Sequence, residues 1–417
     1  MNHSTAQDFR LACYLSDRKT GRLVIVQRRD GRTRVEHLPQ APATELPPLE
    51  RPVLVGVDEE DRVILWDPRD IYLSFEDALP ADAFAAHCYP DPYSSRAFFM
   101  NDGDKENGND TVHCGHEGSS VTAMEDINSA IARHLATVCV GRGHHQAEYT
   151  GPSDKRPDMP RLLWVSSLKD GTLDVVVNDF DRVDDLTLVK RFDLREPERE
   201  EGEGNHAFPH GTAYSEHTGR VYNLNNGYGN VVEIDPYHLE VTRRVDFPGH
   251  SNLFAVPGGR WLIGRGADRK SDPEHVLARL SVLDPEGLEV CHSLTLQDRY
   301  LSKYFFDPEG RRLYLTTGAS GSEAQRANLR DTVLLAFDLD GLPTLREPRE
   351  VDLGGAVGTL EFLPGADGGM GRVACSVGDR GVIALLDAET LEVVEEIELG
   401  VAQPHSRLWA LPQVEWP

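Results

Sequence analysis

The chain has 417 residues and a formal net charge of −26, and 39 % of its residues are hydrophobic. This hydrophobic content is sufficient for a core, whereas such an acidic surface argues against binding to nucleic acid or to anionic membranes, which also carry negative charge. No apolar run approaches the roughly 18 residues of a membrane-spanning helix, so no membrane span is predicted.

The first part of the chain reads as short strands separated by turns. Strands are expected around residues 11–17 and 22–29, and a proline-rich connector follows at residues 39–52. Residues 125–139 differ, because their apolar side chains are spaced three and four apart, as on one face of a helix. We therefore expect a helical insertion near residues 119–140.

The clearest repeat unit begins at His210. Three strands are expected at residues 210–215, 220–225 and 231–235, with turns rich in Gly and Asn between them. A fourth strand leads to His250, where a comparable unit begins. Later units of the same kind follow at residues 300–350 and 357–400.

Repeated four-stranded antiparallel units of about 40–60 residues are typical of a β-propeller. The expected first strands begin near residues 87, 145, 210, 250, 302, 358 and 405, which predicts seven blades, or eight if residues 53–79 form a blade of their own. We expect a single all-β domain over residues 1–417. The strand that begins near residue 405 has no further strand after it in the chain. Residues 10–40 are therefore expected to complete its blade and close the ring.

Histidine opens five of these seven units, at His87, His145, His210, His250 and His405. First strands line the central channel of a propeller and all enter it from the same face, so these imidazoles would form a ring around the axis. Imidazole is the commonest protein ligand of transition metals, which predicts an axial metal site. The alternative is that single histidines hydrogen-bond the blade backbone.

Weaker candidates for metal binding are four further histidines, His144, His206, His113 and His116. His113 and His116 flank Cys114 and could form a small metal site, but no second spaced Cys/His pair completes a zinc-finger frame. His206 is separated from His210 by Pro209, which breaks any helix that could place both on one face. We expect His206 to lie at the rim of the axial site or behind its ligands.

Three families resemble parts of this chain. The segment VIALLDAETLEVVEEIELG resembles the generic YVTN-type propeller repeats, which specify fold rather than function. AHCYPDP and PHSRLWALP look like two histidine motifs of the carotenoid cleavage oxygenases, whose iron is held by four histidines on inner strands. The adjacent pair His144 and His145 is similar to that of the copper propellers nitrous oxide reductase and thiocyanate dehydrogenase, which are exported proteins. The second-shell glutamates of the oxygenases are not identifiable here.

These observations predict a metal-dependent oxidoreductase with a multi-histidine site on the propeller axis. Its metal would be Fe or Cu, with Zn as a further candidate, and it would act on a small molecule with O₂ as a candidate co-substrate. Two other classes stay open. One is a metal-free propeller that serves as a protein-interaction scaffold, and the other is a lactonase or lyase that uses a histidine base at the channel mouth.

The cysteines and the N-terminus bear on the compartment. The six cysteines are scattered and include no CxxC pair, which predicts reduced thiols rather than a disulfide framework. The first residues contain no basic segment followed by an apolar core, so no signal peptide is predicted. Together these features favour a cytoplasmic protein.

Overall fold

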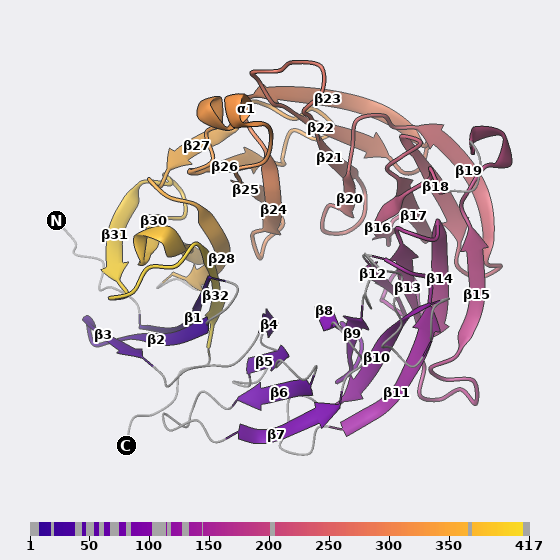
Figure 1. Cartoon of the computed structure of the whole chain (residues 1–417), viewed down its shortest axis with the longest axis horizontal. Coiled ribbons are helices and arrows are strands. Elements are labelled where there is room, and N and C mark those ends of the chain that lie inside the picture. Colours follow the sequence, from indigo (N-terminus) through magenta and orange to yellow (C-terminus); the bar gives the residue numbers. More distant parts are fainter. Residues whose placement is uncertain are drawn as a thin grey trace.

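The computed structural model describes residues 8–17, 21–37, 44–46, 54–57, 62–66, 75–80, 85–101, 114, 118–126, 133–143, 145–200, 205–365 and 369–411. In this part of the chain the strands form eight four-stranded antiparallel sheets. The sheets stand next to one another around a central axis, as the blades of a propeller (Figure 1). The predicted all-β propeller is confirmed. The sequence left seven or eight blades open, and the described residues form eight sheets because β4–β7 make a blade of their own.

Four blades, each from its innermost strand outward, come from the first half of the chain and its C-terminal end: β32 (His405–Ala410), β1 (Phe9–Ser16), β2 (Gly21–Arg29), β3 (Arg32–His37); β4 (Thr44–Leu46), β5 (Leu54–Val57), β6 (Arg62–Trp66), β7 (Phe75–Pro80); β8 (Ala85–Pro90), β9 (Ala97–Asn101), β10 (Ser119–Glu125), β11 (Arg133–Val140); β12 (His145–Thr150), β13 (Leu162–Ser167), β14 (Thr172–Val177), β15 (Leu188–Asp193).

The other four blades come from the second half of the chain: β16 (Pro209–Ser215), β17 (Arg220–Asn225), β18 (Asn230–Asp235), β19 (Glu240–Asp246); β20 (Asn252–Ala255), β21 (Leu262–Asp268), β22 (Leu277–Asp284), β23 (Glu289–Gln297); β24 (Leu301–Phe306), β25 (Arg312–Thr317), β26 (Val333–Asp338), β27 (Arg349–Asp352); β28 (Val357–Pro364), β29 (Met370–Val377), β30 (Val382–Asp387), β31 (Val393–Glu398).

One blade combines the two ends of the chain. The innermost strand β32 pairs antiparallel with β1, from Leu11 opposite Ala410 to Ser16 opposite His405. A hydrophobic cluster then joins this blade to the preceding one, with Leu11 and Leu408 packed among side chains that include Ile383. The pairing satisfies the backbone groups that β32 would otherwise present as an open edge.

The position of a strand within its blade explains its sequence. The middle strands β14 and β18 are buried at every position, whereas the outermost strands β15 and β19 are almost entirely exposed. Each middle strand packs against a neighbouring blade on both faces, so it needs a continuous apolar run rather than alternation. The core of the molecule is accordingly a series of clusters between adjacent blades.

The hairpin between the third and fourth strands of several blades follows a common pattern. An aspartate ends the third strand and a leucine precedes the fourth, as in DPYHLE, DPEGLE and DAETLE. Asp387 accepts the backbone N–H groups of Glu389 and Thr390, while Leu391 adopts a φ of 64° and is buried. Burial of the leucine side chain between blades helps to offset the cost of this left-handed conformation.

The predicted helical insertion near residues 119–140 is wrong. This segment contains β10 and β11, which pair antiparallel from Ser119 opposite Val140 to Glu125 opposite Arg133. The spacing of the apolar residues was misleading, because a short apolar stretch fits a helix and a strand alike. Pairing with the rest of the blade decides between them. The described residues contain one α-helix, α1 (Glu323–Asn328). A capping box between Ser322 and Gln325 stabilises its N-terminus.

The cysteines also depart from expectation. Cys114 and Cys139 form a disulfide, whereas Cys13, Cys88, Cys291 and Cys375 are not disulfide-bonded. The prediction that all cysteines are reduced is therefore wrong. Spacing could not reveal the bond, because a separation of 25 positions between the two cysteines matches no familiar pattern. Within the described ranges, no helix has the length and apolar character to cross a membrane.

Candidate functional site

The innermost strands of the blades surround the centre of the ring (Figure 1). Four of the five histidines that the sequence singled out lie on such strands: His87 on β8, His145 on β12, His210 on β16 and His405 on β32. The fifth, His250, lies two residues before β20. The repeat therefore places these residues on corresponding elements of different blades.

Their surroundings differ from blade to blade. His87 and His210 are half-buried, and the ring of His87 meets Tyr89 edge-on at a centroid distance of 6.3 Å. The backbone carbonyl of His210 accepts a hydrogen bond from Ser166 Oγ at 2.8 Å, which ties β16 to the neighbouring blade. His405 is exposed. His145 begins β12, and its side chain lies outside the described part of the structure.

His250 has a different environment, inside its own blade. Its ring stacks on Phe247 at a centroid distance of 3.9 Å, and Nε2 lies 2.9 Å from Ser281 Oγ. Nδ1 lies 3.3 Å from the carbonyl oxygen of Phe247. The stack fits only because residue 264 is Gly, since a Cβ there would lie 2.1 Å from the Phe247 ring. Burial lowers the pKa of His250 to about 4, so the ring is neutral at physiological pH.

The remaining histidine candidates do not join these residues. His206 is exposed, and its Nδ1 lies 3.1 Å from a Glu200 carboxylate oxygen. His113, His116 and His144 lie outside the described residues. Across the residues that are described, no three His, Cys, Asp or Glu side chains form a group that could hold a metal ion. The predicted ligand set stays a prediction.

A carboxyl group on an innermost strand stands out instead. Glu148 lies in the middle of β12 and is only partly accessible. Its carboxylate accepts hydrogen bonds from the backbone N–H groups of Tyr149 and Tyr214. Burial raises the pKa of Glu148 to about 7 and outweighs these two hydrogen bonds, which favour the charged form. Such a carboxyl can give and take a proton near neutral pH.

The charges of Glu148 and Arg265 both act on Tyr304. Burial raises the pKa of Tyr304 to about 12, the charge of Glu148 raises it further, and that of Arg265 lowers it. Tyr304 lies on β24, and two whole blades separate β24 from β12 along the ring (Figure 1). The interaction therefore crosses the central space. The Tyr304 ring is held by stacking on Phe254 at 4.0 Å.

Arg265 is a half-buried cation without a carboxylate partner in the described part of the chain. Its Nη1 donates to the carbonyl oxygen of Leu301 at 2.6 Å, and its buried Nε has no hydrogen-bond partner among the residues that the structure describes. Burial lowers the pKa of this guanidinium, although arginine stays charged at neutral pH. A guanidinium without a carboxylate partner is suited to hold an anionic group of a ligand.

Sequence reasoning missed these groups. Acidic residues are too numerous in this chain to reveal one that matters, and Arg265 lies on a second strand rather than at a unit start. The sequence did contain a signal for Glu148, namely a charged residue between Ala147 and Tyr149 within a predicted inner strand. Glu361 on β28 shares this signal, and burial also raises its pKa to about 7.

Comparisons with known proteins agree with the fold. Yeast Sqt1 (Saccharomyces cerevisiae) is similar with a TM-score of 0.61 at 11 % identity, over 93 % of each chain. The periplasmic gluconolactonase PpgL of Pseudomonas aeruginosa gives 0.55 at 17 % identity, over 86 % of this chain and 99 % of that one. Dihydro-heme d1 dehydrogenase NirN gives 0.58 at 11 % identity, over 93 % and 72 %. No family model and no curated protein matches this sequence. At these identities the likeness concerns the fold alone.

Proposed function

We propose that this propeller is an enzyme that moves a proton on a small anionic substrate in its central channel, as a lactonase or a lyase. The observation that carries this proposal is Glu148, an inner-strand carboxyl with a pKa of about 7 that interacts with Tyr304 across the ring. Perturbed carboxyls in a concave site are typical of general acids and bases. The similarity in fold to a gluconolactonase supports lactone chemistry by analogy only.

In lactone hydrolysis, the Glu148 carboxylate takes a proton from a water molecule as the water oxygen bonds to the lactone carbonyl carbon. The tetrahedral intermediate collapses by breaking the ring C–O bond, and the protonated Glu148 returns the proton to the departing alkoxide. The products are the hydroxyl and the acid of the opened ring. A pKa near 7 allows the same side chain to act in both steps.

Tyr304 and Arg265 would assist this reaction without exchanging protons. The high pKa of Tyr304 keeps its hydroxyl protonated at neutral pH, so it can donate a hydrogen bond to the oxyanion of the intermediate. Arg265 can hold a carboxylate or phosphate of the substrate, because its charge is not taken by a carboxylate of the described chain. The substrate class proposed is therefore an anionic lactone.

The test is a hydrolysis assay with glucono-δ-lactone and with a lactone that bears a carboxylate, followed by acid release. We expect the rate to rise with pH through about 7, because the base must be deprotonated. Glu148→Gln should lower kcat by about a hundredfold or more at unchanged circular dichroism. Glu361→Gln is the matched control, with a similar pKa on another inner strand, and should retain activity. Equal rates for Glu148→Gln and the parent protein would refute the assignment.

We propose a metal-dependent oxidoreductase as the second candidate function. Its support is that His87, His145, His210 and His405 all lie on innermost strands. The metal would be Fe or Cu, or alternatively Zn, and the substrate a small molecule with O₂ as the oxidant. The described residues do not form a complete ligand set for such a metal.

Metal analysis of untagged protein separates the two candidates. The second candidate predicts at least one equivalent of Fe, Cu or Zn, a lower melting temperature with a chelator, and loss of metal in His210→Ala. The exposed turn residue His217 provides the control substitution. Protein from metal-supplemented growth that contains well under one equivalent of any transition metal would eliminate this candidate.

A further inference from the structure

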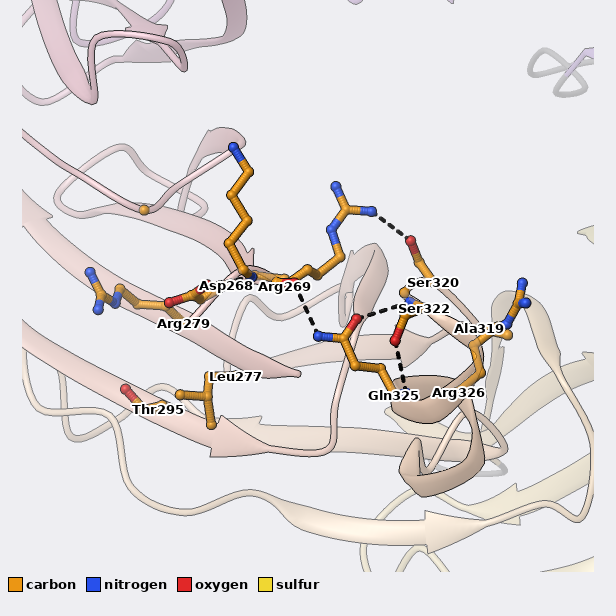
Figure 2. Close-up of a pocket in the computed structure, with 14 residues that line it drawn as sticks. Asp268, Arg269, Leu277, Arg279, Thr295, Ala319, Ser320, Ser322, Gln325 and Arg326 are labelled. Carbon is orange, nitrogen blue, oxygen red and sulfur yellow. Dashed lines mark hydrogen bonds between the residues drawn. The ribbon is translucent and has the colours of Figure 1, made fainter. Parts of the chain in front are cut away.

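A cavity of about 860 Å³ opens beside α1 (Figure 2). One wall is the end of β21 with the segment that follows it, and the opposite wall is the segment from Ala319 to Arg326. Leu277 on β22 and Thr295 on β23 form the floor between them. A cavity of this size suits a small organic ligand.

Four cations line this cavity: Arg269, Lys270, Arg279 and Arg326. Figure 2 shows Arg279 and Arg326 at opposite sides, with Arg269 between them. None of the four forms an ion pair in the described part of the chain, where most other arginines are paired with the abundant carboxylates. Arg279 donates to the Pro248 carbonyl at 3.2 Å, and Arg269 donates to Ser320 Oγ at 2.8 Å.

The single carboxylate of the cavity, Asp268, offsets only one of these four charges. Asp268 accepts hydrogen bonds from the backbone N–H groups of Lys270 and Ser271 and from the Ser271 hydroxyl. The Ser271 hydroxyl and these backbone hydrogen bonds lower the pKa of Asp268 to about 2, and the charge of Arg279 contributes. Four cations and one carboxylate leave a formal charge of +3 in a protein whose net charge is −26. Like charges gathered around one cavity repel one another, and an anion between them relieves that repulsion.

The walls of the cavity are fixed before any ligand arrives. Gln325 is buried, and its side-chain amide donates to the carbonyl oxygens of Arg269 at 3.0 Å and Asp272 at 2.7 Å. Its amide oxygen accepts the backbone N–H of Ser322 at 2.9 Å. One buried side chain thus ties the segment after β21 to α1. Preorganised walls reduce the entropy that binding would otherwise cost.

We propose that this cavity binds a small phosphorylated ligand. Phosphate groups match the site because each carries up to two negative charges and accepts paired hydrogen bonds from guanidinium groups. Arg279 and Arg326, at opposite sides, can hold separate phosphate oxygens or two linked phosphates. The proposal does not depend on the central channel. Tyr300 lies between the two sites, because the Arg269 guanidinium lies 5.6 Å from its ring and Arg265 interacts with it electrostatically.

The test is calorimetric titration of the full-length protein with inorganic pyrophosphate, with orthophosphate and malonate in parallel. We expect one pyrophosphate per chain, weaker binding of orthophosphate and malonate, and a dissociation constant that rises with NaCl. Arg279→Gln and Arg326→Gln should each weaken pyrophosphate binding about tenfold or more. Arg330→Gln is the matched control, because Arg330 lies just beyond α1 and pairs with Glu350 outside the cavity.

Each outcome decides the proposal. No binding of pyrophosphate at millimolar concentration overturns it, as does binding that Arg279→Gln and Arg326→Gln leave unchanged. Malonate binding as tight as pyrophosphate overturns the phosphate assignment in favour of a general dianion site. Since both arginines are exposed, the substituted proteins should keep the parent melting temperature, which excludes misfolding as the cause of lost binding. Failure here leaves the hydrolysis assay of Glu148 unaffected.

Discussion

The buried imidazole of His250 makes the stability of this protein depend on pH in a calculable way. Its pKa is about 4 in the folded chain, whereas an unfolded histidine titrates near 6.5. Below pH 6.5 the unfolded chain therefore binds a proton that the folded chain does not bind, and the free energy of unfolding falls. Between pH 7.5 and 5.5 this linkage removes about 1.3 kcal/mol. The value changes little for any folded pKa below about 5.

The assay is urea denaturation of the parent protein and of His250→Gln at both pH values. Glutamine cannot titrate and loses the stack on Phe247, so we expect His250→Gln to be less stable by about 2 kcal/mol at pH 7.5. At pH 5.5 this difference should shrink by about 1.3 kcal/mol, because only the parent protein suffers the protonation linkage. The sequence pI of about 5.0 argues against measuring at lower pH, where the chain would lose solubility.

His217→Gln is the control for this experiment. His217 is an exposed turn residue, so its replacement should cost much less free energy of unfolding than His250→Gln at either pH. The reasoning fails if His250→Gln costs the same free energy at both pH values. A stability difference that disappears on addition of a chelator at pH 7.5 would instead make His250 a metal ligand.

Three further predictions concern the fold. Alkylation of the denatured, unreduced protein should modify four of its six cysteines, and all six after reduction, because Cys114 and Cys139 are disulfide-bonded; six modified cysteines without reductant would contradict the bond. Deletion of residues 403–417 removes the strand that pairs with β1 and should lower the melting temperature of the whole protein, and an unchanged melting curve would argue against closure. Gly264→Ala places a Cβ 2.1 Å from an aromatic carbon and should cost about 1–3 kcal/mol in urea denaturation, whereas Gly287→Ala, with its nearest contact at 3.4 Å, should cost much less.

Much of the architecture could be read from local sequence. The turns after the first and second strands of the unit that begins at His210 have glycines at φ 68° and 64°, Gly219 and Gly229, where the sequence predicted turns. The strand Arg220–Asn225 has the bounds that alternation and turn chemistry indicated. These signals are local, because a left-handed turn residue and an apolar run act within a few positions of the chain.

The predictions from sequence were wrong where contacts between residues distant in sequence determine the structure. Residues 133–140 carry a helix-like spacing, yet hydrogen bonding to β10 makes them a strand. The disulfide likewise joins Cys139 on β11 to Cys114, which lies 25 positions earlier in the chain. Neither outcome is encoded by spacing alone, because both arise from contacts that exist only once the blade has formed.

The sequence by itself determined that this protein is a propeller and that its histidines recur at corresponding places, since both follow from a repeat. Only the tertiary structure decided what each side chain meets there. His250 turns into its own blade and stacks on Phe247, whereas Glu148 interacts across the ring with Tyr304. The physical reason is that pKa, burial and pairing depend on neighbours from other blades. A repeat specifies where a strand lies, whereas residues from other blades determine the chemistry of the side chains on that strand.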